Sequence, residues 1–200
     1  MSVADPKFCP VCATPLASIE QIEDSGPKTR LRCPACSYTH WNNPVPVLAA
    51  IVEYHGQVLL ARNAAWPPTM FALITGFMEA GETPEGGIAR EVKEETSLDV
   101  TSSTLVGVYD FQRMNQIIIA YHVVAEGEIK LSAELLDYRL HDLQDLKCWP
   151  AGTGYALADW LRSRGHEPVF FTAAEADARR RGLDAPASAS DQDSTHENRS

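Results

Sequence analysis

Residues 76–98 read GFMEAGETPEGGIAREVKEETSL, and this stretch decides the fold expected for the chain. Thr83 is a good helix N-cap, because its hydroxyl can accept a hydrogen bond from a first-turn N–H. Pro84 suits the first helical position, where no backbone donor is needed. The pattern therefore predicts a helix over residues 84–96.

Three carboxylates of this helix, Glu91, Glu94 and Glu95, stand at i, i+3 and i+4, which places them on adjoining turns of one face. Like charges at that spacing cost about 0.2–0.5 kcal/mol per pair. A divalent cation reverses the sign of that energy, and hard oxygen ligands suit Mg²⁺ or Mn²⁺. Arg90 can pair with Glu94 one turn on. A solvated acidic face is the alternative explanation of such a charge run.

The segment resembles the Nudix box, G-x5-E-x7-R-E-U-x-E-E-x-G-U, in which U is aliphatic. The positions that match in register are Gly76, Glu82, Arg90, Glu91, Val92, Glu94, Glu95 and Leu98. Ser97 departs from the pattern, since it stands where the family has glycine. That glycine caps the helix C-terminus, where a positive φ is cheap only without a Cβ.

The resemblance implies an α/β fold, the Nudix α/β/α sandwich with a mixed sheet. A mixed sheet with helices on its faces also follows from the order strand–hairpin–loop–strand–helix–strands–helix along the chain. The family reaction is hydrolysis of a diphosphate linked to another group, in which Mg²⁺ or Mn²⁺ neutralises developing charge and activates water. The residues expected to be catalytic are Glu82, Arg90, Glu91, Glu94 and Glu95, and the backbone at Gly76 is expected to complete the metal sphere.

Four of the five cysteines form two Cys-x2-Cys knuckles separated by twenty residues. They are Cys9, Cys12, Cys33 and Cys36. This spacing predicts one structural Zn²⁺ with four thiolate ligands and no open position. Disulfides or a redox pair are the alternatives, and both fit a reducing compartment poorly. Cys148 is left over, and a lone buried cysteine usually serves packing.

The predicted organisation is a zinc ribbon over residues 1–43, a Nudix hydrolase domain over residues 44–175, and a disordered tail over residues 182–200. The ribbon holds too few apolar residues for a core, so the metal must supply its folding energy. The tail is small and polar, ending ASASDQDSTHENRS. Such a composition cannot offset the entropy of ordering.

A zinc ribbon directly before a Nudix domain resembles the NADH pyrophosphatase subgroup, and also FAD and ADP-ribose pyrophosphatases with the same ribbon. These enzymes can place an aromatic residue near the substrate base five residues past the last knuckle cysteine, where this chain has Trp41. Stacking of adenine on the indole is one reading. The other is that Trp41 packs the ribbon onto the sheet.

Residues 128–136, EIKLSAELL, resemble a late segment that supplies an acidic metal ligand in the NADH enzymes. Glu134 falls at the ligand position. The alternative is that Glu134 is a first-turn helix acid stabilised by the macrodipole, with Ser132 as the N-cap.

The array S-Q-P-W-P-F-P-x-S of NADH pyrophosphatases is missing after the box, where this chain reads GVYDFQRMNQ over residues 107–116. NADH is therefore not expected to be preferred over FAD or ADP-ribose by a large margin. The candidates for substrate contact in this region are Tyr109, Phe111, Gln112 and Gln116. Strand alternation would put Tyr109 and Phe111 on one face and Gln112 on the other. Cross-strand packing explains the aromatic residues equally well.

The net charge of −10 disfavours non-specific binding to nucleic acid, which needs a basic surface. NAD-capped RNA is the one nucleic acid kept as a candidate substrate. No signal peptide and no apolar run of membrane-spanning length are found, so a cytoplasmic location without membrane contact is expected. By resemblance, the default oligomer is a homodimer.

Two functions remain open. The first is a metal-dependent pyrophosphatase acting on an adenine dinucleotide or ADP-sugar. The second is a regulatory protein that senses a nucleotide without cleaving it, or whose zinc ribbon binds a partner. A member of the family that has lost its activity would be expected to lose box glutamates. All of them are present here, which favours an active enzyme.

Overall fold

The computed structural model describes residues 5–183, which form two compact units. One unit consists of residues 5–45 with Phe111–Ile117, and the other of Pro46–Asp110 with residues 118–183. Apart from its first two positions, the predicted tail over residues 182–200 lies outside the described residues.

The cysteine-containing unit is a small antiparallel sheet, β1 (Ala17–Glu23), β2 (Gly26–Arg32) and β3 (Thr39–His40), paired in that order. Its buried apolar residues up to position 45 are only Cys9 and Cys33. This part of the chain therefore has almost no hydrophobic core of its own, as the sequence predicts.

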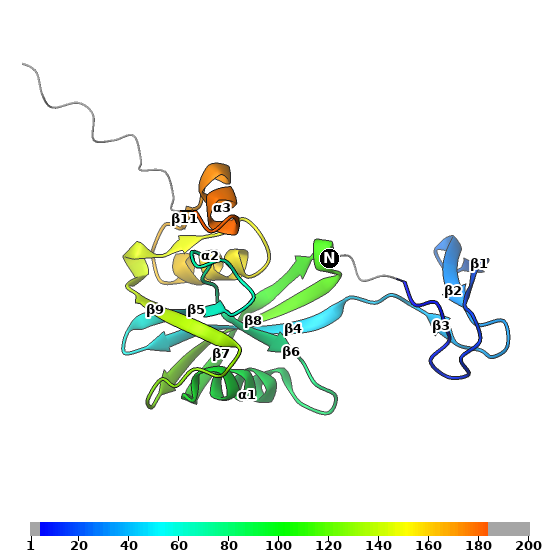
Figure 1. The fold of residues 1–200 in the computed structure, drawn as a ribbon, viewed down its shortest axis with the longest axis horizontal. Helices are drawn as coiled ribbons and strands as arrows, with labels where there is room; N and C mark the ends of the chain where they lie inside the picture. The colour runs from blue at the N-terminus through cyan, green and yellow to red at the C-terminus, as the bar shows by residue number, and fades with distance from the viewer. Residues whose placement is uncertain (1–4, 184–200) are drawn as a thin grey trace, which may run out of the picture. The chain divides into compact units, whose positions relative to one another are not determined.

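The second unit is built on a six-stranded sheet with the order β7-β8-β4-β5-β9, and β6 also pairs with β4 (Figure 1). The strands are β4 (Val45–Tyr54), β5 (Gln57–Asn63), β6 (Ile74–Phe77), β7 (Asp99–Phe111), β8 (Gln116–Glu126) and β9 (Leu135–His141). His55 and Gly56 join β4 to β5 with φ angles of 51° and 78°. Two positive φ angles are typical of a tight hairpin turn.

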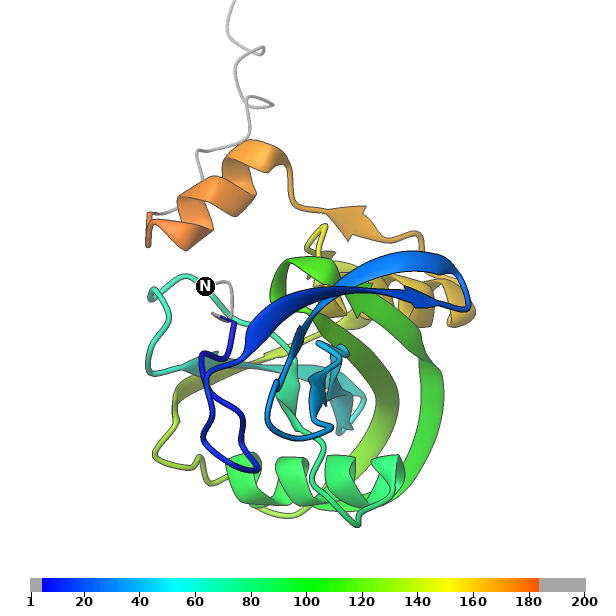
Figure 2. The ribbon, with the colours of Figure 1, turned by 90° about the vertical axis from the view of Figure 1, so that its right-hand side faces the viewer.

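Helices cover both faces of this sheet (Figures 1 and 2). Alternate residues of β4 serve the two faces: Leu48, Ala50 and Val52 pack in the core under α1 (Pro84–Thr96), and Ile51 packs in the core under α2 (Thr153–Ser163). This arrangement confirms the predicted α/β/α sandwich with a mixed sheet.

The structure also contains elements that the sequence does not predict. They are the short turns η1 (Gln112–Met114) and η2 (Leu143–Asp145), the strand β11 (Val169–Phe170) and the helix α3 (Ala173–Arg180). A short strand, β10 (Lys147–Cys148), contains Cys148. β10 and β11 pair in parallel, which brings α3 back over the sheet face that carries α2. No helix within residues 5–183 is long and apolar enough to cross a membrane.

The helix α1 has the predicted bounds and the predicted cap, with the Thr83 hydroxyl accepting from the Gly86 N–H at 3.2 Å. Ser97 ends the helix in the left-handed region, with φ 63° and ψ 4°. It therefore adopts the conformation expected of the family glycine, and its hydroxyl donates to the carbonyl of Lys130 at 3.0 Å. We infer that this hydrogen bond offsets part of the cost of a Cβ in that conformation.

Candidate active site

One guanidinium organises the acidic face of α1. Arg90 donates from Nε and Nη2 to the two carboxylate oxygens of Glu82, at 3.1 and 2.9 Å. Its Nη1 donates to Glu91 at 2.8 Å and to Glu94 at 3.1 Å. A further bond from Nη2 reaches the carbonyl of Phe77 at 3.2 Å. The predicted pairing of Arg90 with Glu94 is present, but the bidentate partner is Glu82.

Glu82 also closes the loop before the helix, because it accepts from the N–H of Glu79 at 2.6 Å. The hydrogen bonds from Arg90, and then the one from Glu79, hold the pKa of Glu82 below its ordinary value. The carboxylates of Glu82, Glu91 and Glu94 raise the pKa of Arg90, and Glu82 is the largest cause. Both groups stay charged, so the loop and the helix are fastened by a stable ion pair.

Glu91 lies directly against the backbone of Gly76. A Cβ added at Gly76 would stand 1.8 Å from Cδ of Glu91. This is the physical reason for glycine at this position, since any side chain would displace the carboxylate. Glu91 is 9% exposed, and burial raises its pKa above the ordinary value.

Glu134 lies near the same carboxylates. Burial first, and then the negative charges of Glu91, Glu134 and Glu94 in that order, together raise the pKa of Glu95 to about 7. The segment before β9 is fastened to the last turn of α1, because the Ser132 N–H donates to the Glu95 carbonyl at 3.0 Å. The alternative reading of Glu134 as a helix acid is wrong. Its N–H donates to the Ser132 hydroxyl in a turn, and the strand β9 follows.

The possible metal ligands on this face are carboxylate oxygens of Glu91, Glu94, Glu95 and Glu134. These groups carry like charges. Crowding of hard anionic ligands fits a divalent cation such as Mg²⁺ or Mn²⁺. Within residues 5–183, however, the four ribbon cysteines are the only group of three or more Cys, His, Asp or Glu whose ligand atoms all lie within 4.8 Å of one another. The carboxylates therefore affect one another's pKa although their oxygens are not as close to one another as the sulfurs of the cysteine group.

The four ribbon cysteines fit a tetrahedral metal. The Sγ atoms of Cys12 and Cys33 are 3.4 Å apart, those of Cys9 and Cys36 are 3.6 Å apart, and those of Cys12 and Cys36 are 3.7 Å apart. Bonds of ~2.3 Å to a tetrahedral Zn²⁺ require sulfurs separated by about 3.8 Å. All these cysteines are free thiols, so the disulfide alternative is wrong.

Cys148 is also a free thiol and is fully buried in the core under α2. Burial raises its pKa to about 11, so the unreactive thiol form persists at neutral pH. Its predicted role in packing is confirmed.

Tyr109 is not brought together with the acidic residues of α1. Its hydroxyl donates to Asp159 of α2 at 3.0 Å, which places it on the other side of the sheet. Burial and that partner raise the pKa of Tyr109 to about 12. The predicted alternation also fails beyond Phe111, since Gln112 belongs to the turn η1 and not to a strand.

Trp41 lies in the unit that holds the ribbon, as do Phe111, Gln112 and Gln116. The guanidinium of Arg30 lies 4.9 Å from the centroid of the indole ring, and the side chain of Arg30 is held by Glu23. Trp41 remains 52% exposed. One face of the indole is therefore supported by a cation, and a large part of the ring is accessible.

Sequence reasoning missed a contact that positions α1. The hydroxyl of Tyr121 on β8 donates to Glu85 in the first turn of the helix at 2.8 Å, and Tyr121 is only 4% exposed. This hydrogen bond holds the pKa of Glu85 below its ordinary value. The only sequence signal for this contact is the alternation of side chains along β8, which places Tyr121 on the face toward α1.

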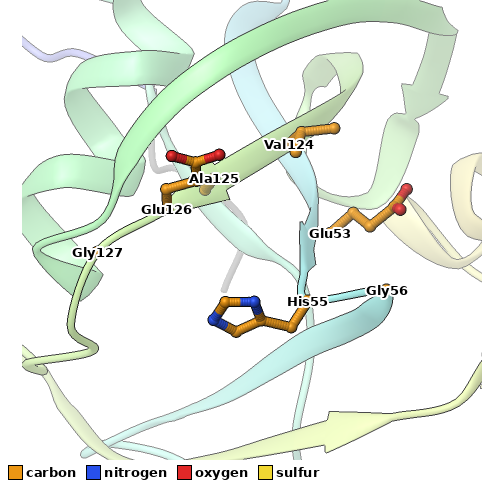
Figure 3. Close-up of a pocket in the computed structure, with 7 residues that line it drawn as sticks. All are labelled: Glu53, His55, Gly56, Val124, Ala125, Glu126 and Gly127. Atoms are coloured by element: carbon orange, nitrogen blue, oxygen red, sulfur yellow. The ribbon is translucent and has the colours of Figure 1, made fainter.

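A separate hollow of about 420 Å³ lies at the ends of β4 and β8 (Figure 3). It is lined by Glu53, His55, Gly56, Val124, Ala125, Glu126 and Gly127. Glu53 is already bound to His122 and Arg164, each at 2.8 Å. The hollow contains none of the box residues. Of its polar side chains, Glu53 already takes part in hydrogen bonds that stabilise the fold.

Residues 42–161 match the model of the NUDIX domain, and the chain belongs to the Nudix family. It is 28% identical to the NUDIX hydrolase from Nitrosomonas europaea, whose crystal structure superposes with a TM-score of 0.67. That match covers 83% of this chain and 97% of the other.

Among curated proteins, the NAD-capped RNA hydrolase NudC of Pseudomonas aeruginosa (strain LESB58) is 29% identical over 171 residues, or 82% of this chain and 59% of the relative. The protein of that name from Stutzerimonas stutzeri (strain A1501) is 26% identical over 151 residues, or 74% of this chain and 52% of the relative. The chain thus spans little more than half the length of these curated relatives.

Gly76→Ala is predicted to displace the Glu91 carboxylate and to weaken Mn²⁺ binding by about 10- to 100-fold, the range typical of losing a group that orients a metal ligand. Gly86→Ala is the matched control, because a Cβ at Gly86 meets only the Thr83 hydroxyl at 3.3 Å. Mn²⁺ titration followed by electron paramagnetic resonance measures both. Equal affinities in the two variants would contradict the assignment.

Glu95 should make stability depend on pH when no divalent cation is added. Its pKa is raised from 4.5 to about 7, so the folded chain holds this proton more tightly than the unfolded chain does. The free energy of unfolding should therefore fall as the pH rises from about 4.5 to about 7. Glu95→Gln should remove this part of the slope, and added Mg²⁺ should offset it. Urea unfolding at pH 5 and pH 8 measures the effect, with the exposed Glu128→Gln as control.

Proposed function

We propose that this chain hydrolyses the diphosphate bond of a nucleoside diphosphate linked to another moiety, using Mg²⁺ or Mn²⁺. The observation that carries the proposal is the set of box glutamates: Arg90 binds Glu82, Glu91 and Glu94, and the charges of Glu91, Glu94 and Glu134 act on Glu95. Membership of the Nudix family supports the reaction class. A nucleotide sensor without activity would have no need of four carboxylates near enough to affect the charge of one of them, so hydrolysis is favoured over sensing.

Glu91, Glu94, Glu95 and Glu134 would hold the cation, with the backbone at Gly76 beside them. A bound divalent cation supplies positive charge to the diphosphate and lowers the pKa of an attacking water. The chain's own contribution is orientation. Arg90 holds three carboxylates in place, and its pair with Glu82 fixes the loop that leads into the helix.

The substrates proposed are adenine dinucleotides or ADP-sugars, the class of NADH, FAD and ADP-ribose. NAD-capped RNA is included because the curated relatives carry the name NAD-capped RNA hydrolase. The exposed indole of Trp41, supported by Arg30 on one side, is offered as the stacking surface for adenine. Phe111, Gln112 and Gln116 are retained as candidate contacts. Tyr109 is a weaker candidate because Asp159 already engages its hydroxyl.

The ribbon is proposed to bind one structural Zn²⁺ through Cys9, Cys12, Cys33 and Cys36, supported by their close approach. We retain residues 1–43 as the ribbon and residues 44–175 as the hydrolase domain. A homodimer and a cytoplasmic location also stay proposals, resting on resemblance.

The test of the function is a substrate panel of NADH, FAD, ADP-ribose and NAD-capped RNA, with identification of the products at saturating Mg²⁺. Glu95→Gln should lower kcat by orders of magnitude, because it removes an anionic ligand without changing volume. Glu128→Gln, an exposed residue paired with Lys130, is the matched control and should turn over normally. Near-normal turnover by the Glu95→Gln variant would refute the assignment. No cleavage of any substrate by the unmodified chain would refute the activity.

For the zinc site, metal analysis of protein purified under reducing conditions should find one Zn²⁺ per chain. Removal of the ion should unfold the ribbon before the Nudix domain, since the ribbon has almost no core of its own. Circular dichroism with a chelator, followed by readdition of Zn²⁺, measures this order. Cys148→Ser is the control, because this buried thiol lies outside the cluster and should leave the zinc content unchanged.

A further inference from the structure

Basic side chains gather on the sheet face opposite to α1, between β9 and α3. Arg139 and His141 stand two residues apart on β9 and so lie on the same face. Their partners across the sheet are Leu60 and Val58, both buried in the core under α2. Arg179 reaches the same region from α3.

Two guanidiniums meet around one buried residue, Phe71. The guanidinium carbon of Arg139 lies 4.1 Å from the centroid of the Phe71 ring. Arg179 donates from Nη2 to the Phe71 carbonyl at 3.3 Å, and its guanidinium carbon lies 4.3 Å from the centroid of the Phe171 ring. Each of these two arginines is therefore seated on an aromatic ring.

Seating on a ring leaves the donors of a guanidinium available. Its five N–H groups lie in the plane of the fork, so contact between one face and a phenyl ring uses none of them. Within the described part of the chain, the side chain of Arg139 makes no hydrogen bond or ion pair. The side chain of Arg179 makes only its hydrogen bond to the Phe71 carbonyl there, and no ion pair. The aromatic rings thus hold two guanidinium groups in place, and most N–H groups of these guanidiniums have no hydrogen-bond partner within the described residues.

Like charges are crowded at this place. The pKa of His141 is lowered by burial first, then by the charge of Arg139, with Arg179 acting in the same direction. Asp145 is the acid that opposes this effect on His141. Glu175, which faces Arg179, already binds Lys147 at 3.0 Å and the Thr172 N–H at 2.7 Å. In a chain with a net charge of −10, this cluster is not explained by general basicity.

We propose that Arg139, His141 and Arg179 bind a phosphate group, either free phosphate or the phosphomonoester of a nucleotide. A tetrahedral phosphate presents several acceptor oxygens, so it can take charge-assisted hydrogen bonds from two forks in different planes and from an imidazole. The site lies on the other side of the sheet from the carboxylates of α1. It does not depend on the proposed hydrolysis.

The experiment is calorimetric titration of the full, zinc-loaded chain with inorganic phosphate, against chloride at the same ionic strength. Saturable binding is expected. The double variant Arg139→Gln, Arg179→Gln should lose at least about tenfold in affinity, since two charge-assisted partners are removed. The matched control is Arg180→Gln, Arg181→Gln, which removes the same charge at the end of the same helix from arginines paired with Asp177. It should bind phosphate within about twofold of the unmodified chain.

A second titration with adenosine 5′-monophosphate separates the two sources of phosphate. Loss of nucleotide binding in the Arg139/Arg179 variant assigns a nucleotide, whereas loss confined to inorganic phosphate assigns the free ion. If the double variant fails to fold, Arg139→Gln alone retains the test, because the side chain of this exposed residue makes no hydrogen bond. The proposal would be overturned if phosphate and chloride at the same ionic strength gave the same heat of titration. It would also be overturned if the two double variants bound phosphate with equal affinity.

Discussion

The attraction between the Arg90 guanidinium and three carboxylates is the interaction on which the acidic face of α1 depends. Without it, Glu82 in the loop and Glu91 and Glu94 in the second half of the helix would repel one another. A lysine could not replace it, because a single ammonium cannot present a flat fork to Glu82 while also reaching the helix. The same fork reaches the Phe77 carbonyl, so it also ties the helix to the end of β6.

Space is the second constraint, and it explains the residues around that fork. Gly76 leaves room for the Glu91 carboxylate, and Gly87 leaves room for Glu82 and Leu48, since a Cβ there would meet both at 2.5 Å. The carboxylates are thus held close to backbone by missing side chains as much as by hydrogen bonds. Burial is also the largest cause of the raised pKa of Glu95 on the same helix.

Local chemistry determined what the sequence could predict. Thr83, Pro84 and the spacing of the glutamates act within one helix, so its bounds and its acidic face followed from neighbouring residues. The cysteine spacing was informative for the same reason. Contacts such as Tyr121 to Glu85 or Tyr109 to Asp159 join residues 36 and 50 positions apart, and no local pattern records them. Tyr155 shows the limit of helical periodicity, since this aromatic residue of α2 is 45% exposed.

The two faces of the sheet crowd charges of opposite sign by the same physical means. On the α1 face, burial and like charges raise the pKa of Glu95, which is the direction expected for an acid that lacks a counter-ion. On the α3 face, burial and like charges lower the pKa of His141, the corresponding direction for a base. Each cluster weakens the fold unless an ion of the opposite sign binds. The reasoning that assigns a cation to the glutamates of the box therefore applies, with the sign reversed, to Arg139 and Arg179.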